Sequence, residues 1–235
     1  MSCCIETISR HVSIRKYTDE PVKPEDLEAI VEAARRAPTS WGIQPFTVTI
    51  VTDGELKAKL AEAVGGQEHV AKAPVFLVFS VDYRKLAEAA RIHGVEFAEP
   101  GLGHLLIGVV DAGIAAGWAA LAAESLGYGI VFIALYSNPC RIAEILNLPE
   151  QVLPVVGLCV GRPAEKPSPK PRQPREVFAA ENRYIALDEE AARKVAYVFG
   201  EKTQRIYSYV LSKGGYYEQV TRRLLECARR RGFRI

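Results

Sequence analysis

The sequence predicts a layered fold in which helices pack on a β-sheet, of the α/β or α+β class. Short β-branched runs of strand length alternate along the chain with longer segments whose apolar residues recur at helical spacing. Hydrophobic residues make up 49% of the 235 residues and charged residues 25%, so the chain can bury a sizeable core. Interleaved helices and strands bury their apolar faces by stacking in layers.

The first half of the chain is expected to hold two helices and two strands. Pro24 and two acidic residues open the first helix, and Pro38 stops it. Asp53 and Gly54 start the second helix. The expected elements are, in order, a helix over 22–36, a strand over 46–51, a helix over 53–63 and a strand over 75–81.

A long apolar segment, residues 102–126, dominates the second half. Nearly every face of this helix would be apolar, so it is expected in the core or at a subunit interface. His104, Asp111, Glu124 and Ser125 interrupt it before roughly 20 uncharged residues accumulate, which argues against a membrane span. The elements expected after it are a strand over 130–135, a helix over 139–146 and a strand over 155–160.

A proline-rich segment follows these strands. Five prolines between residues 161 and 174 each remove a backbone donor and fix φ, so this segment is expected to be an extended arm. Helical texture returns at residues 188–232. The expected organisation is therefore one domain at 1–187, which includes the arm at 161–184, and a helical C-terminal appendage at 188–235 that is not an independent domain.

Charge and cysteine usage exclude several classes of function. A net charge of +2 is too small for an electrostatic nucleic-acid surface. The five cysteines form no Cys-x-x-Cys pair and no metal-ligand spacing with the histidines, so no metal site is expected. Their odd number and the lack of a signal peptide favour a reducing cytosol, in which Cys140 and Cys159 are buried small apolar residues.

One local excess of basic charge, the arginines between 222 and 234, has two interpretations. It is either a solvated helix face or a docking site for an anionic ligand.

The residues that could carry chemistry are scattered. The chain has no nucleophile elbow, no phosphate-binding Gly-x-x-x-x-Gly-Lys loop and no Gly-x-Gly-x-x-Gly fingerprint. What remains is a group of cationic, hydroxyl and amide side chains that together suit a phosphorylated cofactor, although each alone is more often a turn or surface residue. The group comprises His11, Ser13, Arg15, Thr39, Ser40, Gln44, Gln67, Lys170 and Arg172.

Several separated motifs make this group more specific. They are HVSIRKYTDEPV at 11–22, APTS at 37–40, QPF at 44–46, GGQEHVA at 65–71, AAESLG at 122–127 and KPR at 170–172. In this order they resemble the nitroreductase-like FMN-dependent oxidoreductases, in the branch that contains the major oxygen-insensitive NADPH nitroreductase and NADPH–flavin oxidoreductase. The resemblance runs from about residue 5 to residue 184.

The resemblance implies an α+β fold with three layers, in which helices flank a central mixed, mainly antiparallel sheet. It also implies an intertwined, cytoplasmic homodimer with one FMN at each of two interfaces. NADPH or NADH would be the electron donor, and nitroaromatics, quinones or free flavins the acceptors. Turnover would be ping-pong, with two electrons passing through flavin N5 and no side chain acting as a general acid, whereas Arg15 would act as an electrostatic stabiliser.

The resemblance also assigns roles to individual residues. His11, Ser13, Lys170 and Arg172 would hold the FMN phosphate, Arg15 would lie near flavin N1 and O2, and Gln67 would bond the pyrimidine edge. Thr39 and Ser40 would line the flavin, and the turn at Tyr128, Gly129 and Ile130 would approach N5, where a side chain would block hydride transfer. The expected cofactor-binding set is completed by Val12, Ile14, Gln44 and Pro171.

Trp41 and Gly42 depart from the more polar residues common after the serine loop, which could change how substrates stack. Two alternatives to the enzyme remain. One is a protein that sequesters or delivers FMN with little turnover, and the other is an enzyme of the same fold that uses a different acceptor.

Overall fold

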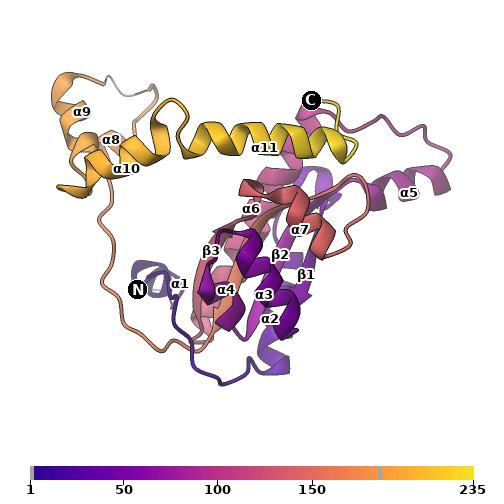
Figure 1. Ribbon diagram of the computed structural model, residues 1–235, viewed down its shortest axis with the longest axis horizontal. Helices are drawn as coiled ribbons and strands as arrows, with labels where there is room; N and C mark the ends of the chain where they lie inside the picture. Colours follow the sequence, from indigo (N-terminus) through magenta and orange to yellow (C-terminus); the bar gives the residue numbers. More distant parts are fainter. Residues whose placement is uncertain (1–2, 185–186) are drawn as a thin grey trace. The chain divides into compact units, whose positions relative to one another are not determined.

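The computed structural model describes residues 3–184 and 187–235, and it divides them into two units. Unit 1 is the chain up to Pro167 together with Arg222–Ile235, and unit 2 is Ser168–Thr221. Unit 1 contains the sheet and most of the helices (Figure 1).

The sheet of unit 1 has four strands in the order β1-β2-β4-β3. Their bounds are β1 Phe46–Val51, β2 Val75–Asp82, β3 Gly129–Ala134 and β4 Val152–Gly161. All three neighbouring pairs among these strands are antiparallel: β1 with β2, β2 with β4, and β4 with β3. The predicted mainly antiparallel character of the sheet is confirmed, and the four described strands pair only in the antiparallel sense.

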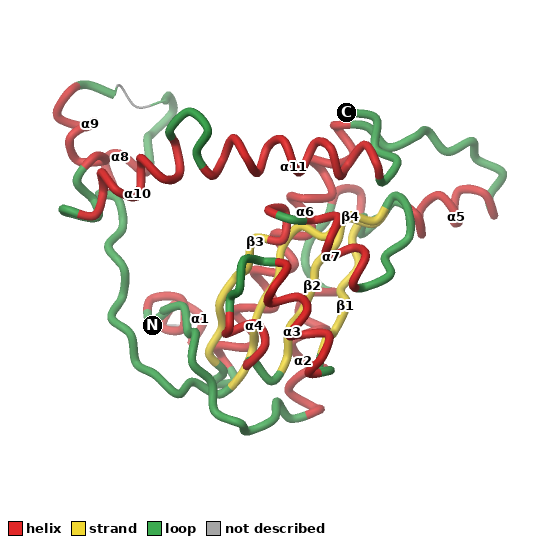
Figure 2. The backbone as a smooth tube through the Cα atoms, in the orientation of Figure 1, coloured by secondary structure: helices red, strands yellow, loops and turns green. Residues whose placement is uncertain are grey.

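Helices cover both faces of this sheet, which makes three layers (Figure 2). On one face, α2 (Pro24–Arg35) and α6 (Leu102–Ser125) pack with Leu77, Phe79 and Leu158. The other face carries α3 (Gly54–Ala63), α4 (Glu68–Lys72) and α7 (Pro139–Ile145), which enclose a second cluster. Every residue of β2 is buried because this strand lies under both layers. The short helices α1 (Cys3–Ser9) and α5 (Arg84–Ile92) complete unit 1.

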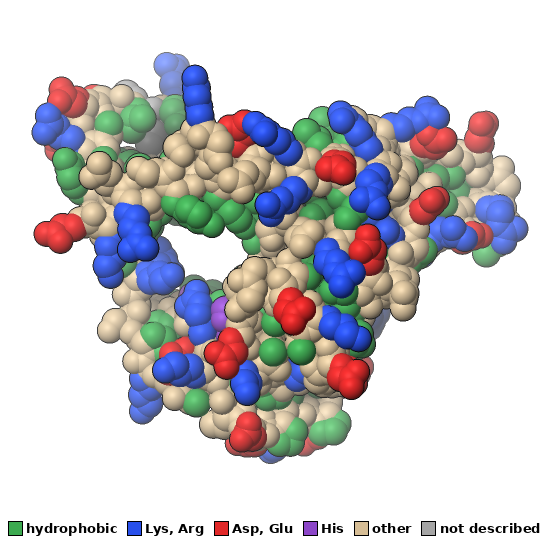
Figure 3. Space-filling view, in the orientation of Figure 1, with side chains coloured by type: hydrophobic (Ala, Val, Ile, Leu, Met, Phe, Trp, Pro, Cys, Tyr) green, Lys and Arg blue, Asp and Glu red, His purple; other side chains and the backbone are tan. Residues whose placement is uncertain are grey.

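Local sequence explains where several of these elements begin. Pro24 occupies the first turn of α2, where its missing N–H has no intrahelical partner to lose. The side chain of Asp53 accepts a hydrogen bond from the N–H of Leu56 at 2.8 Å and so caps α3. On the side of the sheet that carries α3, α4 and α7, Lys and Arg side chains lie among Asp and Glu side chains, so this layer has a solvated outer surface (Figure 3).

Helix α6 has two dissimilar apolar faces. Small residues such as Ala112, Ala116 and Ala119 are buried against the sheet and α2. At Gly108 an added Cβ would lie 2.6 Å from Val81 Cγ1, so only glycine permits this close packing. The opposite face exposes large apolar side chains, namely Leu102, Leu106, Ile107, Val109, Val110, Ile114 and Trp118. Although α6 is long and apolar enough to cross a membrane, its alanine face makes it a core helix of the layered unit.

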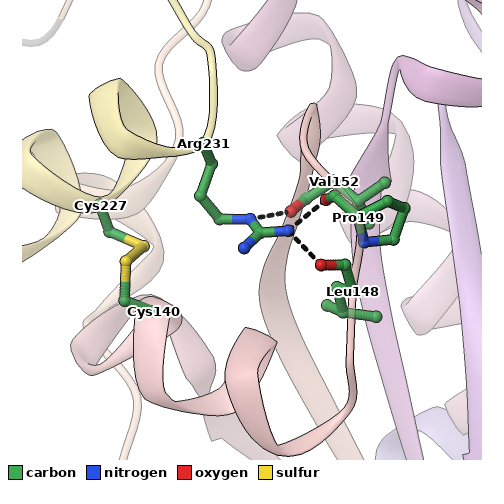
Figure 4. Close-up of a disulfide and its surroundings, with 6 residues drawn as sticks. All are labelled: Cys140, Leu148, Pro149, Val152, Cys227 and Arg231. Atoms are coloured by element: carbon green, nitrogen blue, oxygen red, sulfur yellow. Dashed lines mark hydrogen bonds between the residues drawn. A yellow bond between two sulfur atoms is a disulfide. The ribbon is translucent and has the colours of Figure 1, made fainter.

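The end of the chain is fastened to unit 1 covalently and by hydrogen bonds (Figure 4). Cys227 on α11 (Tyr216–Arg230) forms a disulfide with Cys140 on α7. Beside it, the Arg231 guanidinium donates to the carbonyl oxygens of Val152 at 2.7 Å and Leu148 at 2.6 Å, and also to that of Pro149. The disulfide corrects the interpretation of Cys140 as an unpaired apolar residue, whereas Cys159 is buried and free as expected.

Unit 2 holds the expected arm and most of the helical appendage. The chain is extended from Ser168 to Pro174, and α8 (Arg175–Phe178) then interrupts the arm, where no proline prevents a helical turn. The helices α9 (Glu189–Ala196) and α10 (Lys202–Leu211) follow. The expected boundary between 187 and 188 does not match these units: unit 2 begins earlier, at Ser168, and residues 222–235 belong to unit 1 because Cys227 and Arg231 bind there.

Candidate functional site

The N-terminal motif runs as an extended segment beside the sheet. The Ile14 N–H donates to the Ile130 carbonyl at 2.8 Å, which joins the motif to β3. Further along, the Thr18 N–H donates to the Arg162 carbonyl at 3.0 Å and the Ala164 N–H to the Lys16 carbonyl at 2.9 Å. The segment from Ile14 to Thr18 is therefore fixed between the start of β3 and the chain that leaves β4.

Two backbone N–H groups in this segment hold a carboxylate. Glu165 Oε1 accepts from the N–H of Arg15 at 2.5 Å and from the N–H of Lys16 at 3.1 Å. The side chains of Arg15 and Lys16 are exposed, and Tyr17 turns inward to donate its hydroxyl hydrogen to the Ile14 carbonyl at 2.7 Å. Burial raises the pKa of Tyr17 well above its usual range, so this phenol stays protonated.

His11 is paired with a carboxylate from α6. Its Nδ1 lies 2.7 Å from Glu124 Oε1, and both side chains are partly buried. The pairing anchors the start of the motif to the C-terminal end of α6. Val12 and Ser13, the next two residues, are half-buried.

The turn before β3 is shaped by packing. The hydroxyl of Tyr128 donates to Asp26 Oδ2 at 2.7 Å and accepts from the N–H of Lys23 at 3.2 Å, while the Arg162 guanidinium lies 4.2 Å from its ring centroid. A Cβ on Gly129 would lie 2.6 Å from Ile14 Cγ1. The side chain of Tyr128 is therefore directed into the core, and glycine at 129 is already required by contact with Ile14, without reference to a ligand.

The serine loop lies on α6 as well. The N–H of Ser40 donates to the buried carboxylate of Asp111 at 3.0 Å, and Gln44 donates through Nε2 to the Arg35 carbonyl at 2.8 Å. Thr39 Oγ1 accepts from the Gln44 N–H at 3.4 Å. Trp41 stands out from this loop with 95% of its surface exposed and a positive φ of 53°, a backbone conformation that is unusual for a bulky residue.

These contacts place the serine loop and the start of the motif at different points along α6. Asp111 and Glu124 are 13 positions apart in one helix, which corresponds to about 20 Å along its axis. Within one chain, Ser40 is therefore not brought beside His11.

Helix α4 supplies a further part of the site. Gln67 precedes its first residue and donates through Nε2 to the Val64 carbonyl at 2.9 Å. Two residues later, His69 Nε2 is buried with no hydrogen-bond partner among the described residues. Burial, together with the nearby positive charge of Arg15, lowers the pKa of His69, and Glu165 opposes this shift. His69 thus shares an electrostatic environment with the N-terminal motif.

The KPR motif lies in unit 2. Lys170, Pro171 and Arg172 are exposed, and the guanidinium of Arg172 donates to the Lys170 carbonyl at 3.0 Å. Their predicted contact with a cofactor phosphate stays a prediction.

Comparison with known proteins identifies the family. The model of the Nitroreductase family matches residues 8–162, which contain the sheet and every motif except KPR. The chain belongs to the nitroreductase family.

Individual relatives of this nitroreductase-family protein agree. It is 43% identical over 200 residues to the FMN reductase [NAD(P)H] of Bacillus subtilis, which covers 84% of this chain and 80% of that protein. It is 39% identical over 215 residues to the oxygen-insensitive NADPH nitroreductase of Salmonella typhimurium, which covers 91% and 85%. The solved structure of the hypothetical oxidoreductase YcnD from Bacillus subtilis superposes with a TM-score of 0.89 at 37% identity, and covers 100% of this chain and 99% of that one.

The predicted family, its three-layer α+β fold and the oxidoreductase class are thereby confirmed. Sequence reasoning missed the acidic partners of the motif residues. Asp111, Glu124 and Glu165 each bind a residue of the predicted set, from positions 71, 113 and 150 residues away. Glu124 lies in the AAESLG motif, but no local pattern pairs it with His11 or marks Asp111 and Glu165 as partners, because each becomes a neighbour only through the fold.

Proposed function

We propose that this nitroreductase-family chain is an FMN-dependent NAD(P)H oxidoreductase that reduces nitroaromatics, quinones or free flavins. The observation that carries the proposal is the fixed segment at Ile14 and Arg15, which is bonded to β3 at Ile130 and to Glu165 in a chain 43% identical to an FMN reductase [NAD(P)H]. FMN would be the bound cofactor, and NADPH or NADH the electron donor.

The residues present fit an anionic flavin. Consecutive N–H groups at Arg15 and Lys16 already bind the carboxylate of Glu165, which shows that this segment stabilises negative charge. The exposed guanidinium of Arg15 is free to approach a ligand at the same place. Within the motif, Ser13 offers a hydroxyl and His11 an imidazole to the phosphate, which Lys170 and Arg172 would complete with positive charge.

When bound, FMN supplies the two-electron redox chemistry. Arg15 would stabilise negative charge at the N1 and O2 side of the ring through its guanidinium. Gln67 would offer its amide to the pyrimidine edge, and the backbone at Gly129 and Ile130 would face N5. The electron donor and the acceptor would bind at the flavin one after the other, which would give ping-pong kinetics and need no general acid from the protein.

Assembly as a homodimer would account for the separation of the site residues. Because the serine loop and His11 lie about 20 Å apart along α6, a second chain can bring Thr39, Ser40 and Gln44 to a flavin held at the motif. The exposed apolar face of α6 provides the surface for such a contact. We therefore propose an intertwined, cytoplasmic homodimer with two flavin sites.

The first experiment is the visible spectrum of the purified protein. We expect flavin absorption, release of the flavin by heat, and chromatographic identity with FMN. Recovery of FAD alone, or of no flavin even after incubation with FMN, would overturn the assignment.

Turnover separates an enzyme from a flavin-sequestering protein. We expect steady NAD(P)H oxidation with a quinone or a nitroaromatic, with parallel lines in double-reciprocal plots. A protein that binds FMN tightly but oxidises NAD(P)H only once per flavin would be the sequestering alternative.

A further inference from the structure

Glu165 makes an unusual contact for a residue just beyond a strand. One oxygen of its carboxylate accepts hydrogen bonds from the backbone N–H groups of Arg15 and Lys16, at 2.5 and 3.1 Å. The side chain is only partly exposed, so these charge-assisted bonds are not fully screened by water. The contact joins two segments that are 150 residues apart in the sequence.

The surrounding contacts fix the register of this bond. On one side the Ala164 N–H donates to the Lys16 carbonyl, and on the other the Thr18 N–H donates to the Arg162 carbonyl. The ring of Tyr17 packs so close to Gly161 that an added Cβ there would lie 2.9 Å from Tyr17 Cδ1. Glu165 is therefore held where its carboxylate meets the N–H groups of Arg15 and Lys16.

We propose that Glu165 is a positioning residue of the flavin site, which fixes the backbone of Arg15 and sets the reduction potential of the bound cofactor through its negative charge. The inference rests on the proposed function, in which the Arg15 guanidinium lies at the N1 and O2 side of the flavin. A backbone anchored at its own N–H presents that guanidinium in a restricted orientation.

The charge of Glu165 has a second effect. A carboxylate beside Arg15 offsets part of the positive field that would stabilise added electrons, so it lowers the reduction potential. His69 from α4, Arg15 and Tyr17 share this electrostatic environment with Glu165. Because Lys16 points its side chain to solvent, its backbone serves Glu165 while its charge is screened.

Two substitutions separate the anchoring role from the charge. Glu165→Gln keeps an acceptor oxygen and removes the charge, whereas Glu165→Ala removes both. Glu55→Gln on α3 is a matched control, since it neutralises an exposed carboxylate elsewhere in unit 1. For each protein we would measure the Kd for FMN by fluorescence titration, the midpoint potential of the bound flavin, and amide exchange over residues 12–18 without flavin.

We expect Glu165→Ala to weaken FMN binding by about tenfold or more and to speed exchange over 12–18, because a pair of charge-assisted bonds is lost. Glu165→Gln should bind FMN within about threefold of wild type while its potential shifts to more positive values. If the alanine variant does not fold, the shift in the glutamine variant still tests the proposal.

The outcomes distinguish this inference from the function on which it rests. Wild-type protein that binds no FMN overturns the proposed function and the role of Glu165 together. Wild-type protein that binds FMN, with both Glu165 variants unchanged in Kd and potential, overturns the role of Glu165 alone. A glutamine variant that loses affinity as the alanine variant does, with no shift in potential, indicates a purely structural contact and also overturns it.

Discussion

Arg15 has separate tasks for its backbone and its side chain. The backbone N–H is bonded to Glu165, whereas Glu20 pairs with Arg162 at 3.5 Å and not with the exposed guanidinium of Arg15. Arg15 is therefore not the partner of Glu20 in a surface ion pair. Its side chain is available to a ligand.

Arg15→Leu should accordingly slow flavin reduction more than it destabilises the fold. Loss of one preorganised donor should raise the barrier by about 2 to 4 kcal/mol, or roughly 10²- to 10³-fold in rate. Stopped-flow reduction of the flavin-saturated variant by NAD(P)H measures this, and Lys16→Leu, which removes the neighbouring exposed cation, is the control. A rate for Arg15→Leu within about twofold of wild type would contradict the assigned role.

The lowered pKa of His69 predicts how the stability of the protein depends on pH. Burial and Arg15 lower its pKa in the folded state, so the unfolded chain, whose His pKa is about 6.5, binds the proton more readily. The contribution of neutral His69 to stability is complete above the unfolded pKa and is lost as the pH falls through that value toward the folded pKa. Denaturant unfolding at several pH values measures this. The unfolding free energy of His69→Asn should decrease less at acid pH than that of wild type, whereas the exposed control His93→Asn should show the same decrease as wild type.

At the scale of residues, the motifs predicted the chemistry more fully than the contacts. His11, Arg15 and Ser40 could be singled out because they lie in motifs, and Glu124 lies in the AAESLG motif, but its pairing with His11 and the roles of Glu165 and Asp111 as partners depend on the fold. Glycine at 129 was expected for cofactor access, and its contact with Ile14 supplies an independent reason that only the packing reveals.

The element formed by the motif and β3 can be tested through that contact. Gly129→Ala should cost about 1 to 3 kcal/mol of unfolding free energy, because its Cβ would press on Ile14. In an Ile14→Ala background the same change should cost less, by a coupling of about 0.5 kcal/mol or more. Urea unfolding of the four proteins in the cycle measures this, and equal costs in both backgrounds would show that the contact with Ile14 is not the cause.

The C-terminal half of α11 depends on the disulfide. Cys140 and Cys227 are separated by 87 residues, a span that includes β4 and all of unit 2. Replacing both cysteines by serine should lower stability by about 2 to 5 kcal/mol, because the unfolded chain regains the freedom of this loop. Amide exchange should rise over residues 222–235 while β2 stays protected.

Two controls accompany this variant. Cys4→Ser removes an exposed free thiol and should leave stability unchanged. A thiol reductant should reproduce the loss in wild-type protein and have no effect on the double variant. Equal stability of wild type and double variant in the absence of reductant would mean that the bond does not fasten α11.

Most elements could be predicted because their periodicity is strong. Strand β1 has the expected bounds, and helix α3 begins at Gly54, one residue after the expected start, with Asp53 as its cap. The short helices α1, α4 and α8 were missed, since a run of one or two turns bounded by loops gives little periodic signal, and the amphipathic α5 was missed as well. The antiparallel order of the sheet and the Cys140–Cys227 bond depend on long-range pairing, which a single sequence does not specify.

The chain passes between the two units twice, after Pro167 and again before Arg222 within α11. Unit 2 is an insertion between β4 and the anchored C-terminal segment, and a split into an N-terminal domain and a terminal appendage does not describe that topology. The periodicity of the sequence could not reveal this insertion. Residues 222–235 share the helical pattern of the inserted segment and differ from it only in the residues that they contact.

The proposed homodimer can be tested through helix α6. Its outer face exposes Leu106, Val110 and Trp118, a contiguous apolar surface of the kind that soluble proteins usually cover with a partner. Val110→Glu should therefore convert a dimer into a species near the chain mass of 25.9 kDa, since burial of an unpaired carboxylate at the interface is costly. Light scattering reports the mass, and Ile92→Glu on the exposed side of α5 is the control for a new surface charge.

Because the serine loop and His11 lie far apart within one chain, the monomeric variant should also lose most of its affinity for FMN. A Val110→Glu monomer that retains flavin with wild-type affinity would show that one chain completes the site alone.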